Sequence, residues 1–347
     1  MIGYYVHHHG KGHLHRARAL TECWRRAGTA VTVLSSLTRP EDWHGPWVQL
    51  PRDDLGPHPV DAGAGGQLHW VPLGDSGIRT RAAALSAWVE EARPSVVVVD
   101  VSVETALLVR LHGVPVVTVV QPGHRTDAPH LAGYRASSAL VACWPETWAE
   151  ADLDLTPGLP DDVRGRIERV GAISRLDVRP HVAAPRDRGA RHAVLLQGRG
   201  GDALWQGPVD RLARRTPGWT WTVLGGEAPW VDDPSTLLSG ADVVVATAGQ
   251  GSIADVAALR RPMVVVPSPR PYDEQQVTAT ALDGGPWPVV VVADPADAFR
   301  SEVLDEAAEL DGAGWGSWCD GGATDRFRRV VEAAAFPVGH VAEDGSP

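Results

Sequence analysis

The sequence contains no asparagine and a single lysine, Lys11, among 347 residues, so arginine supplies nearly all of its positive charge. The formal net charge is -11 at pH 7. Nucleic acids and anionic lipids bind proteins through clustered Lys and Arg, so this charge balance argues against a nucleic-acid partner. An anionic ligand would therefore need a locally positive pocket.

Cysteine and long apolar runs are also scarce. Cys23, Cys143 and Cys319 are odd in number, far apart and in no C-x-x-C arrangement, which argues against a disulfide framework and a zinc site. No apolar run reaches the roughly 18 residues of a membrane span, and the first residues lack the pattern of a secretion signal. We therefore expect a cytoplasmic protein, with peripheral contact at the inner face of the membrane left open.

Short apolar runs separated by helical stretches recur along the chain. This alternation predicts α/β lobes, each with a parallel sheet covered on both faces. The expected strands are 2–6, 30–34, 95–100, 115–120 and 138–144 in the first half, then 192–197, 220–224, 241–247, 262–267 and 288–292.

The length of the chain favours two domains. We expect an N-terminal domain over 1–170 and a second domain over 171–325, with a hinge near 171–190, where Pro, Arg and Asp accumulate. The remaining segment, 326–347, contains a helix that is a candidate to pack back on the first lobe before a flexible tail.

One Gly-rich turn in the second half has the pattern of a phosphate site. The strand expected over 241–247 leads into AGQGS and then into a helix expected to begin near Ser252. Backbone amides and the positive end of such a helix favour a phosphate group. The alternative is a plain connection with glycines for tight packing. The residues concerned are Ala248, Gly249, Gln250, Gly251 and Ser252.

The order of parts across 230–276 resembles the MurG-type GT-B glycosyltransferases, which are UDP-sugar dependent and related to undecaprenyl-diphospho-muramoylpentapeptide β-N-acetylglucosaminyltransferase. The resemblance implies a GT-B fold, in which two Rossmann-like parallel-sheet lobes face each other across a cleft. In this family the first lobe binds the acceptor and the second lobe binds the nucleotide-sugar donor.

The resemblance assigns nucleotide-binding roles to three residues. Trp230 would stack on the uracil, and the backbone of Val231 would read the edge of the base. Asp255 stands where the family has a glutamate that bonds the ribose hydroxyls. From the residues alone, packing is the better interpretation of Trp230, and Ser252 with Asp255 also fits an S-x-x-D capping box.

The donor sugar and the diphosphate have their own candidates. Asp273, Gln275 and Gln276 match the acid and paired glutamines that hold the sugar hydroxyls, although a polar helix start facing water is the alternative. Ala279 replaces an asparagine of the family, which leaves the identity of the sugar open. The resemblance places the following residues near the diphosphate: Arg175, Gly198 and Arg199, the last with a surface role as alternative.

The stretch HHHGKGHLHR is a strand-loop-helix corner that lacks the Ser or Thr of a P-loop after Lys11. Consecutive histidines at 7–9 point in opposite directions, which disfavours a metal site. The stretch resembles the G-G-H turn of the MurG-type enzymes, so Gly12 would border the donor and His13 would be the base. His13 as a helix cap or phosphate ligand, and Asp100 as an alternative base or acceptor-orienting group, remain open.

The resemblance implies an inverting, metal-independent transfer of a hexose or N-acetylhexosamine to an acceptor hydroxyl. The donor would be a UDP-sugar, with a dTDP-sugar as the alternative, and no other cofactor is expected. The pathway would be bacterial cell-envelope or natural-product synthesis, and the acceptor a lipid-linked carrier or a small metabolite. Two alternatives remain: a nucleotide-sugar hydrolase that uses water, and a non-catalytic nucleotide-sugar binding module.

Overall fold

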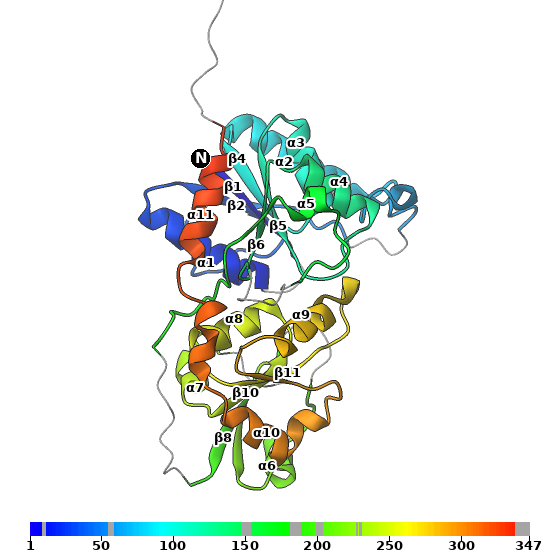
Figure 1. Cartoon of the computed structure of the whole chain (residues 1–347). Coiled ribbons are helices and arrows are strands. Elements are labelled where there is room, and N and C mark those ends of the chain that lie inside the picture. The colour runs from blue at the N-terminus through cyan, green and yellow to red at the C-terminus, as the bar shows by residue number, and fades with distance from the viewer. Residues whose placement is uncertain are drawn as a thin grey trace, which may run out of the picture.

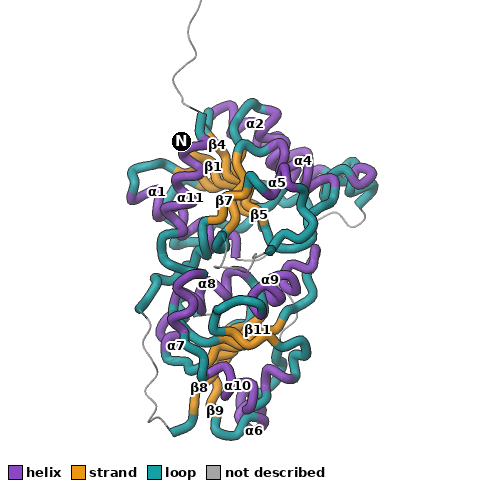
Figure 2. Tube along the Cα trace, in the orientation of Figure 1, coloured by secondary structure: helices purple, strands orange, loops and turns teal. Residues whose placement is uncertain are grey.

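The computed structural model describes residues 1–8, 12–54, 59–146, 154–180, 189–198, 204–226, 228 and 231–336. Within them the chain forms two α/β lobes, one above the other (Figure 1). Each lobe has a central parallel sheet with helices on both faces (Figure 2). Among the described residues, no helix has the length and apolar character needed to cross a membrane.

The sheet of the first lobe has the strand order β3-β2-β1-β4-β5-β6-β7. Its strands are β1 (Ile2–Val6), β2 (Val31–Ser35), β3 (Trp47–Gln49), β4 (Val96–Asp100), β5 (Val116–Val120), β6 (Ala139–Ala142) and β7 (Ile167–Arg169). The helices around it are α1 (Gly12–Arg26), α2 (Ser76–Ala92), α3 (Val103–Leu111), α4 (Ala128–Ala136) and α5 (Asp161–Arg164).

The sheet of the second lobe has the strand order β12-β11-β10-β8-β9. Its strands are β8 (Arg191–Leu196), β9 (Trp219–Leu224), β10 (Val243–Thr247), β11 (Met263–Val266) and β12 (Val289–Val291). Its helices are α6 (Val209–Arg215), α7 (Ser235–Ser239), α8 (Gln250–Ala258), α9 (Glu274–Asp283) and α10 (Ser301–Ala308).

The apolar runs of the sequence form the central strands of both sheets. Every residue of β4 and β5 is buried, because parallel strands packed by helices on both faces have no solvent side. The expected fold class is therefore confirmed. The two strands absent from the sequence analysis, β3 and β7, are three-residue edge strands with exposed positions and no apolar run.

The helix after the second lobe returns to the first lobe. This helix, α11 (Ala323–Ala334), lies beside α1 (Figure 1). The buried rings of Phe327 and Trp24 meet edge to face with centroids 6.2 Å apart, and Arg326 donates to the Val170 carbonyl oxygen at 2.8 Å. The tail beyond Phe336 lies outside the described residues.

The two lobes meet through the loops that follow their strands. In Figure 1, α8 and α9 lie on the face of the second lobe that points toward the first lobe. Arg16 on α1 donates to Gln250 on α8 at 3.4 Å, and Arg125 pairs with Glu274 on α9 at 3.0 Å. The carboxyl ends of β1 and β10 are thereby brought to one cleft, where ligands of open parallel sheets bind.

Candidate active site

A cleft of about 290 Å³ lies between the lobes, at the first turns of α1, α8 and α9. We call it the interlobe cleft. Most residues singled out from the sequence line it, although they come from distant parts of the chain. These residues are Gly12, His13, Arg175, Gly198, Val231, Gly249, Gln250, Gly251, Ser252, Asp255 and Gln275.

The start of α8 presents backbone rather than side chains to the interlobe cleft. Gly249 is the N-cap and makes no side-chain capping bond, and the helix begins at Gln250. A Cβ atom added at Gly251 would meet no atom within 4 Å, so packing does not require this glycine and the tight-packing alternative fails there. The amides of the first helical turn are available to an anion.

Asp255 is buried inside α8 and does not cap it. Its carboxylate accepts hydrogen bonds from Ser174 Oγ at 2.8 Å and Arg175 Nε at 2.9 Å. Burial raises the pKa of Asp255 above its usual value, although Arg175 acts in the opposite direction. The capping-box alternative is therefore wrong, because the N-cap is Gly249 and the carboxylate of Asp255 belongs to this pair.

His13 is held by a buried carboxylate at the end of β4. Its Nδ1 lies 2.9 Å from Asp100 Oδ1, and the Tyr4 hydroxyl donates to Asp100 Oδ2 at 3.1 Å. Burial alone would raise the pKa of Asp100, but the guanidinium of Arg16 and His13 outweigh burial and keep it below its usual value. Asp100 is thus an anion that accepts the Nδ1 proton, which leaves Nε2 of His13 free to take a proton.

Asp100 has no exposed surface, so it cannot itself contact an acceptor. The geometry gives it the role of positioning His13 rather than that of a base. Arg16 is also buried, between Asp100 at 3.5 Å and Gln250, so it is not a solvated surface charge.

Five predicted residues lie elsewhere or outside the described residues. Asp273 and Gln276 are exposed and do not line the interlobe cleft, and Ala248 is buried in the core of the second lobe. Trp230 and Arg199 lie outside the described residues, as does Lys11.

Glu274 lines the interlobe cleft, although the sequence analysis did not single it out. Tyr272 and Asp273 both have positive φ, at 62° and 53°, and this turn brings Glu274 and Gln275 to the cleft. Gln275 is held by the Ser268 amide, which donates to its Oε1 at 2.9 Å. Glu274 stands between the predicted Asp273 and Gln275, but sequence spacing does not reveal such a turn.

A second and larger pocket, of about 830 Å³, borders His13 from the first lobe. We call it the leucine-lined pocket. Its apolar wall comes from α2, α3 and the loop before α2, and consists of Leu68, Trp70, Val71, Ile78, Ala82, Leu85, Leu107, Leu108 and Leu111. His13 lines both this pocket and the interlobe cleft.

Two groups of potential metal ligands lie outside the interlobe cleft in the described part of the chain. One consists of His8, Asp53 and Asp54, and the other of His69, Asp127 and His130. In the first group, Asp53 also pairs with Arg81 at 3.4 Å, and Asp54 with Arg52. These arginines already balance the carboxylates that a metal would need.

Comparisons with known proteins agree with this architecture. Residues 227–283 match the model of the glycosyltransferase family 28 C-terminal domain. A UDP-N-acetylglucosamine--N-acetylmuramyl-(pentapeptide) pyrophosphoryl-undecaprenol N-acetylglucosamine transferase of Sorangium cellulosum is 32% identical over 149 residues. The match covers 41% of this chain but only 34% of that relative.

Two solved structures share the fold over nearly the whole chain. MurG of Acinetobacter baumannii has a TM-score of 0.61 at 14% identity, with 96% of this chain and 99% of that chain covered. A Streptomyces glycosyltransferase in complex with thymidine diphosphate has a TM-score of 0.59 at 15% identity, with coverage of 96% and 99%. The expected GT-B fold is confirmed, and residues 227–283 of its second lobe match the glycosyltransferase family 28 C-terminal domain, in agreement with the resemblance noted in the sequence.

Proposed function

We propose that the protein is an inverting glycosyltransferase that moves a hexose or N-acetylhexosamine from a UDP-sugar to an acceptor hydroxyl. The observation that carries the proposal is the position of His13, which is anchored by Asp100 and borders both the interlobe cleft and the leucine-lined pocket. A donor in the cleft and an acceptor in the pocket would meet at this side chain.

The proposed reaction is a single in-line displacement. The acceptor oxygen forms a bond to the anomeric carbon while the bond from that carbon to the diphosphate oxygen breaks. The acceptor proton passes to Nε2 of His13, because Nδ1 is engaged with Asp100. Inversion follows because the nucleophile enters opposite the leaving diphosphate.

The departing diphosphate would be stabilised by the amides at the start of α8 and by the adjacent start of α1. Arg175 lines the same cleft and would contribute charge from its place beside Asp255. We propose that these groups balance the negative charge without a divalent metal. The carboxylate of Asp255 would accept hydrogen bonds from the ribose hydroxyls with its remaining lone pairs.

We further propose that the donor nucleotide carries uracil, with thymine as the alternative, and that the acceptor is either lipid-linked or a small metabolite. The name of the Sorangium relative gives UDP-N-acetylglucosamine as donor, which supports uracil, whereas the thymidine diphosphate in the Streptomyces structure keeps thymine as the alternative. The same relative acts on a pyrophosphoryl-undecaprenol acceptor. A lipid-linked acceptor would place this protein at the cytoplasmic face of the membrane, whereas a small metabolite would not.

The test is a donor screen with UDP- and dTDP-linked glucose and N-acetylglucosamine, with products identified by mass spectrometry. The His13→Ala variant should lose roughly 10²- to 10⁴-fold in turnover and still bind UDP with the affinity of the wild type. His112→Ala, a histidine on the far end of α3, is the matched control. Free sugar produced at the same rate with and without acceptor would instead indicate a hydrolase, and UDP binding without turnover would indicate a binding module.

A further inference from the structure

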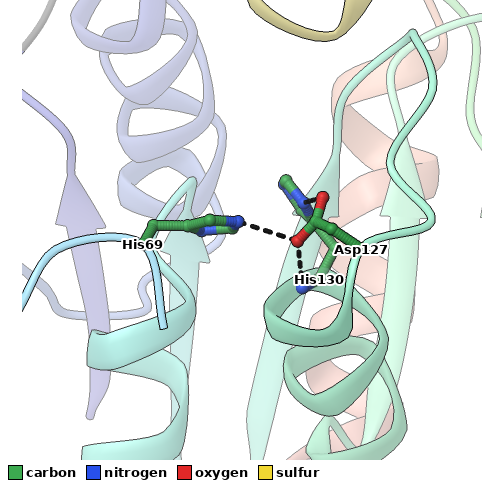
Figure 3. A group of neighbouring side chains, drawn as sticks. All are labelled: His69, Asp127 and His130. Carbon is green, nitrogen blue, oxygen red and sulfur yellow. Dashed lines mark hydrogen bonds and ion pairs between the residues drawn. The ribbon is translucent and has the colours of Figure 1, made fainter. Parts of the chain in front are cut away.

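A second histidine-aspartate pair borders the leucine-lined pocket. His69 lines the pocket, and its Nε2 lies 2.9 Å from Asp127 Oδ1. Figure 3 shows Asp127 between His69 and His130, the latter from the first turn of α4. The pocket therefore has one anchored histidine at the proposed transfer point and another on its wall.

The pair is the end of a polar chain that crosses to the second lobe. Nδ1 of His130 lies 2.6 Å from Asp127 Oδ2, and Nε2 of His130 lies 3.2 Å from Arg125 Nη1. Arg125 continues the chain by donating to Glu274 at 3.0 Å. Asp127, His130 and Arg125 thus each have partners on both sides.

This chain determines where the protons lie. An arginine can only donate, so Nε2 of His130 accepts and its proton sits on Nδ1, from which it is donated to Asp127. Burial alone would raise the pKa of Asp127, but hydrogen bonds from His130 and His69 hold it at about 2. Asp127 is therefore an anion that accepts a proton from Nε2 of His69, which leaves Nδ1 of His69 as a hydrogen-bond acceptor.

Two histidines and an aspartate are also a typical zinc-binding set, but the geometry here opposes a metal. A metal on Nδ1 of His130 would force the ring proton onto Nε2, where it would face the donating guanidinium of Arg125 at 3.2 Å. The positive charge of Arg125 would also repel the cation. These three side chains are therefore arranged for hydrogen bonding rather than for metal binding.

The walls of the pocket disfavour a pyrophosphate. Arg81 is paired with Asp53 at 3.4 Å, and Arg125 with Glu274 at 3.0 Å, so neither charge is left for an anion. Arg270 is shared with the interlobe cleft, where the diphosphate of the donor would lie. The apolar side chains of α2 and α3 supply much of the remaining wall, and a volume of about 830 Å³ suits a small organic molecule.

We propose that the leucine-lined pocket binds an apolar small molecule with two hydroxyl groups, of which one meets His13 and the other donates to Nδ1 of His69. His69 is then a specificity-determining residue for the acceptor. The inference rests on the proposed function only in naming this molecule the acceptor and His13 the base. The pocket, the proton positions and the paired arginines stand independently of it.

The experiment measures binding by calorimetry with the full chain and without a nucleotide sugar. The probes are 7-hydroxyflavone, with one hydroxyl, and a set of dihydroxyflavone isomers. For the wild type, the best dihydroxyflavone should bind roughly 5- to 10-fold more tightly than the monohydroxy probe, which is the effect of one hydrogen bond. His69→Ala should abolish this preference while the affinity for 7-hydroxyflavone changes by less than about twofold.

Two further variants separate binding from folding. His69→Phe keeps an aromatic ring in the wall but lacks a hydrogen-bond acceptor, so it should also lose the preference, whereas the control His112→Ala should keep it. A preference that survives in His69→Ala and His69→Phe, or equal binding of all flavones to the wild type, would overturn the inference. Tight binding of undecaprenyl diphosphate with no flavone binding would overturn it as well.

The flavone experiment and the test of the proposed function can fail independently of each other. If the His69-dependent preference is present but no donor is turned over, the transferase proposal fails and the pocket assignment stands. If sugar transfer proceeds but no flavone distinguishes His69→Ala from the wild type, the pocket assignment alone fails.

Discussion

At the scale of single residues, Gly251 separates stability from ligand binding. A side chain at this position would enter the open interlobe cleft, because no atom lies within 4 Å of its Cβ position. Gly251→Ala should leave the melting temperature unchanged or raise it slightly, since alanine stabilises a helix by roughly 0.5–1 kcal/mol relative to glycine. Gly251→Val should weaken UDP binding by at least about tenfold in calorimetry, because the valine side chain would occupy the space that the phosphates need. Equal UDP affinity in Gly251→Val and the wild type would place the diphosphate elsewhere.

His130 gives the protein a stability that depends on pH. Burial lowers the pKa of His130 to about 4. The positive charge of Arg125 also lowers this pKa, whereas the hydrogen bond to Asp127 raises it. The unfolded chain, with its histidine pKa near 6.5, therefore binds more protons between about pH 6.5 and 4, so the free energy of unfolding falls as pH decreases through this window. His130→Gln should flatten this dependence in urea unfolding at several pH values. The exposed His44→Gln should keep the slope of the wild type.

Asp273 and Gln276 were misplaced for one physical reason. Gln275 lines the interlobe cleft and Gln276 does not, because the left-handed turn at Tyr272 and Asp273 sets which side of α9 faces inward. Positive φ is uncommon outside glycine, and a tyrosine such as Tyr272 gives no sequence signal for it. His13 was predictable because its motif fixes it at the start of a helix, whereas its partner Asp100 became a positioning residue only once the burial of β4 was known.

At the scale of elements, α11 ties the end of the chain to the first lobe. Phe327 is fully buried against Trp24, so Phe327→Ala should lower the free energy of unfolding by about 3–5 kcal/mol, measured by urea denaturation. Phe336→Ala also removes a phenyl ring, but from a position that is 66% exposed. It should change the free energy of unfolding by less than about 0.5 kcal/mol. Similar effects in both variants would mean that α11 does not dock as described.

Strands were the most predictable elements. The valine runs of β4, β5 and β10 are buried on both faces, so their composition alone marks them. The edge strands β3 and β7 depend on pairing with a neighbour already in place, which a local pattern does not contain. The return of α11 to α1 is likewise a long-range contact, and only its amphipathic pattern could be read in advance.

At the scale of the whole molecule, a short loop of the first lobe docks on the start of α9. Gly123 has φ of 109°, and a Cβ atom there would lie 2.3 Å from the carbonyl oxygen of Tyr272. Gly123→Ala should therefore push the lobes apart, which would increase the radius of gyration in X-ray scattering and reduce sugar transfer at least about tenfold. Gly113→Ala imposes a similar backbone strain at φ of 75° where nothing lies within 4 Å. If Gly113→Ala has the same effects, then strain rather than the contact between lobes explains them.

The contribution of Tyr272, a residue of the second lobe, to a pocket of the first lobe has a thermodynamic consequence. A ligand in the leucine-lined pocket touches both lobes and so favours the arrangement in which they meet, as does a ligand in the interlobe cleft. By linkage, each of the two ligands must then raise the affinity for the other by the same factor. Cooperativity between two different small molecules thus follows from a pocket whose wall includes Tyr272 and its neighbours from the opposite lobe.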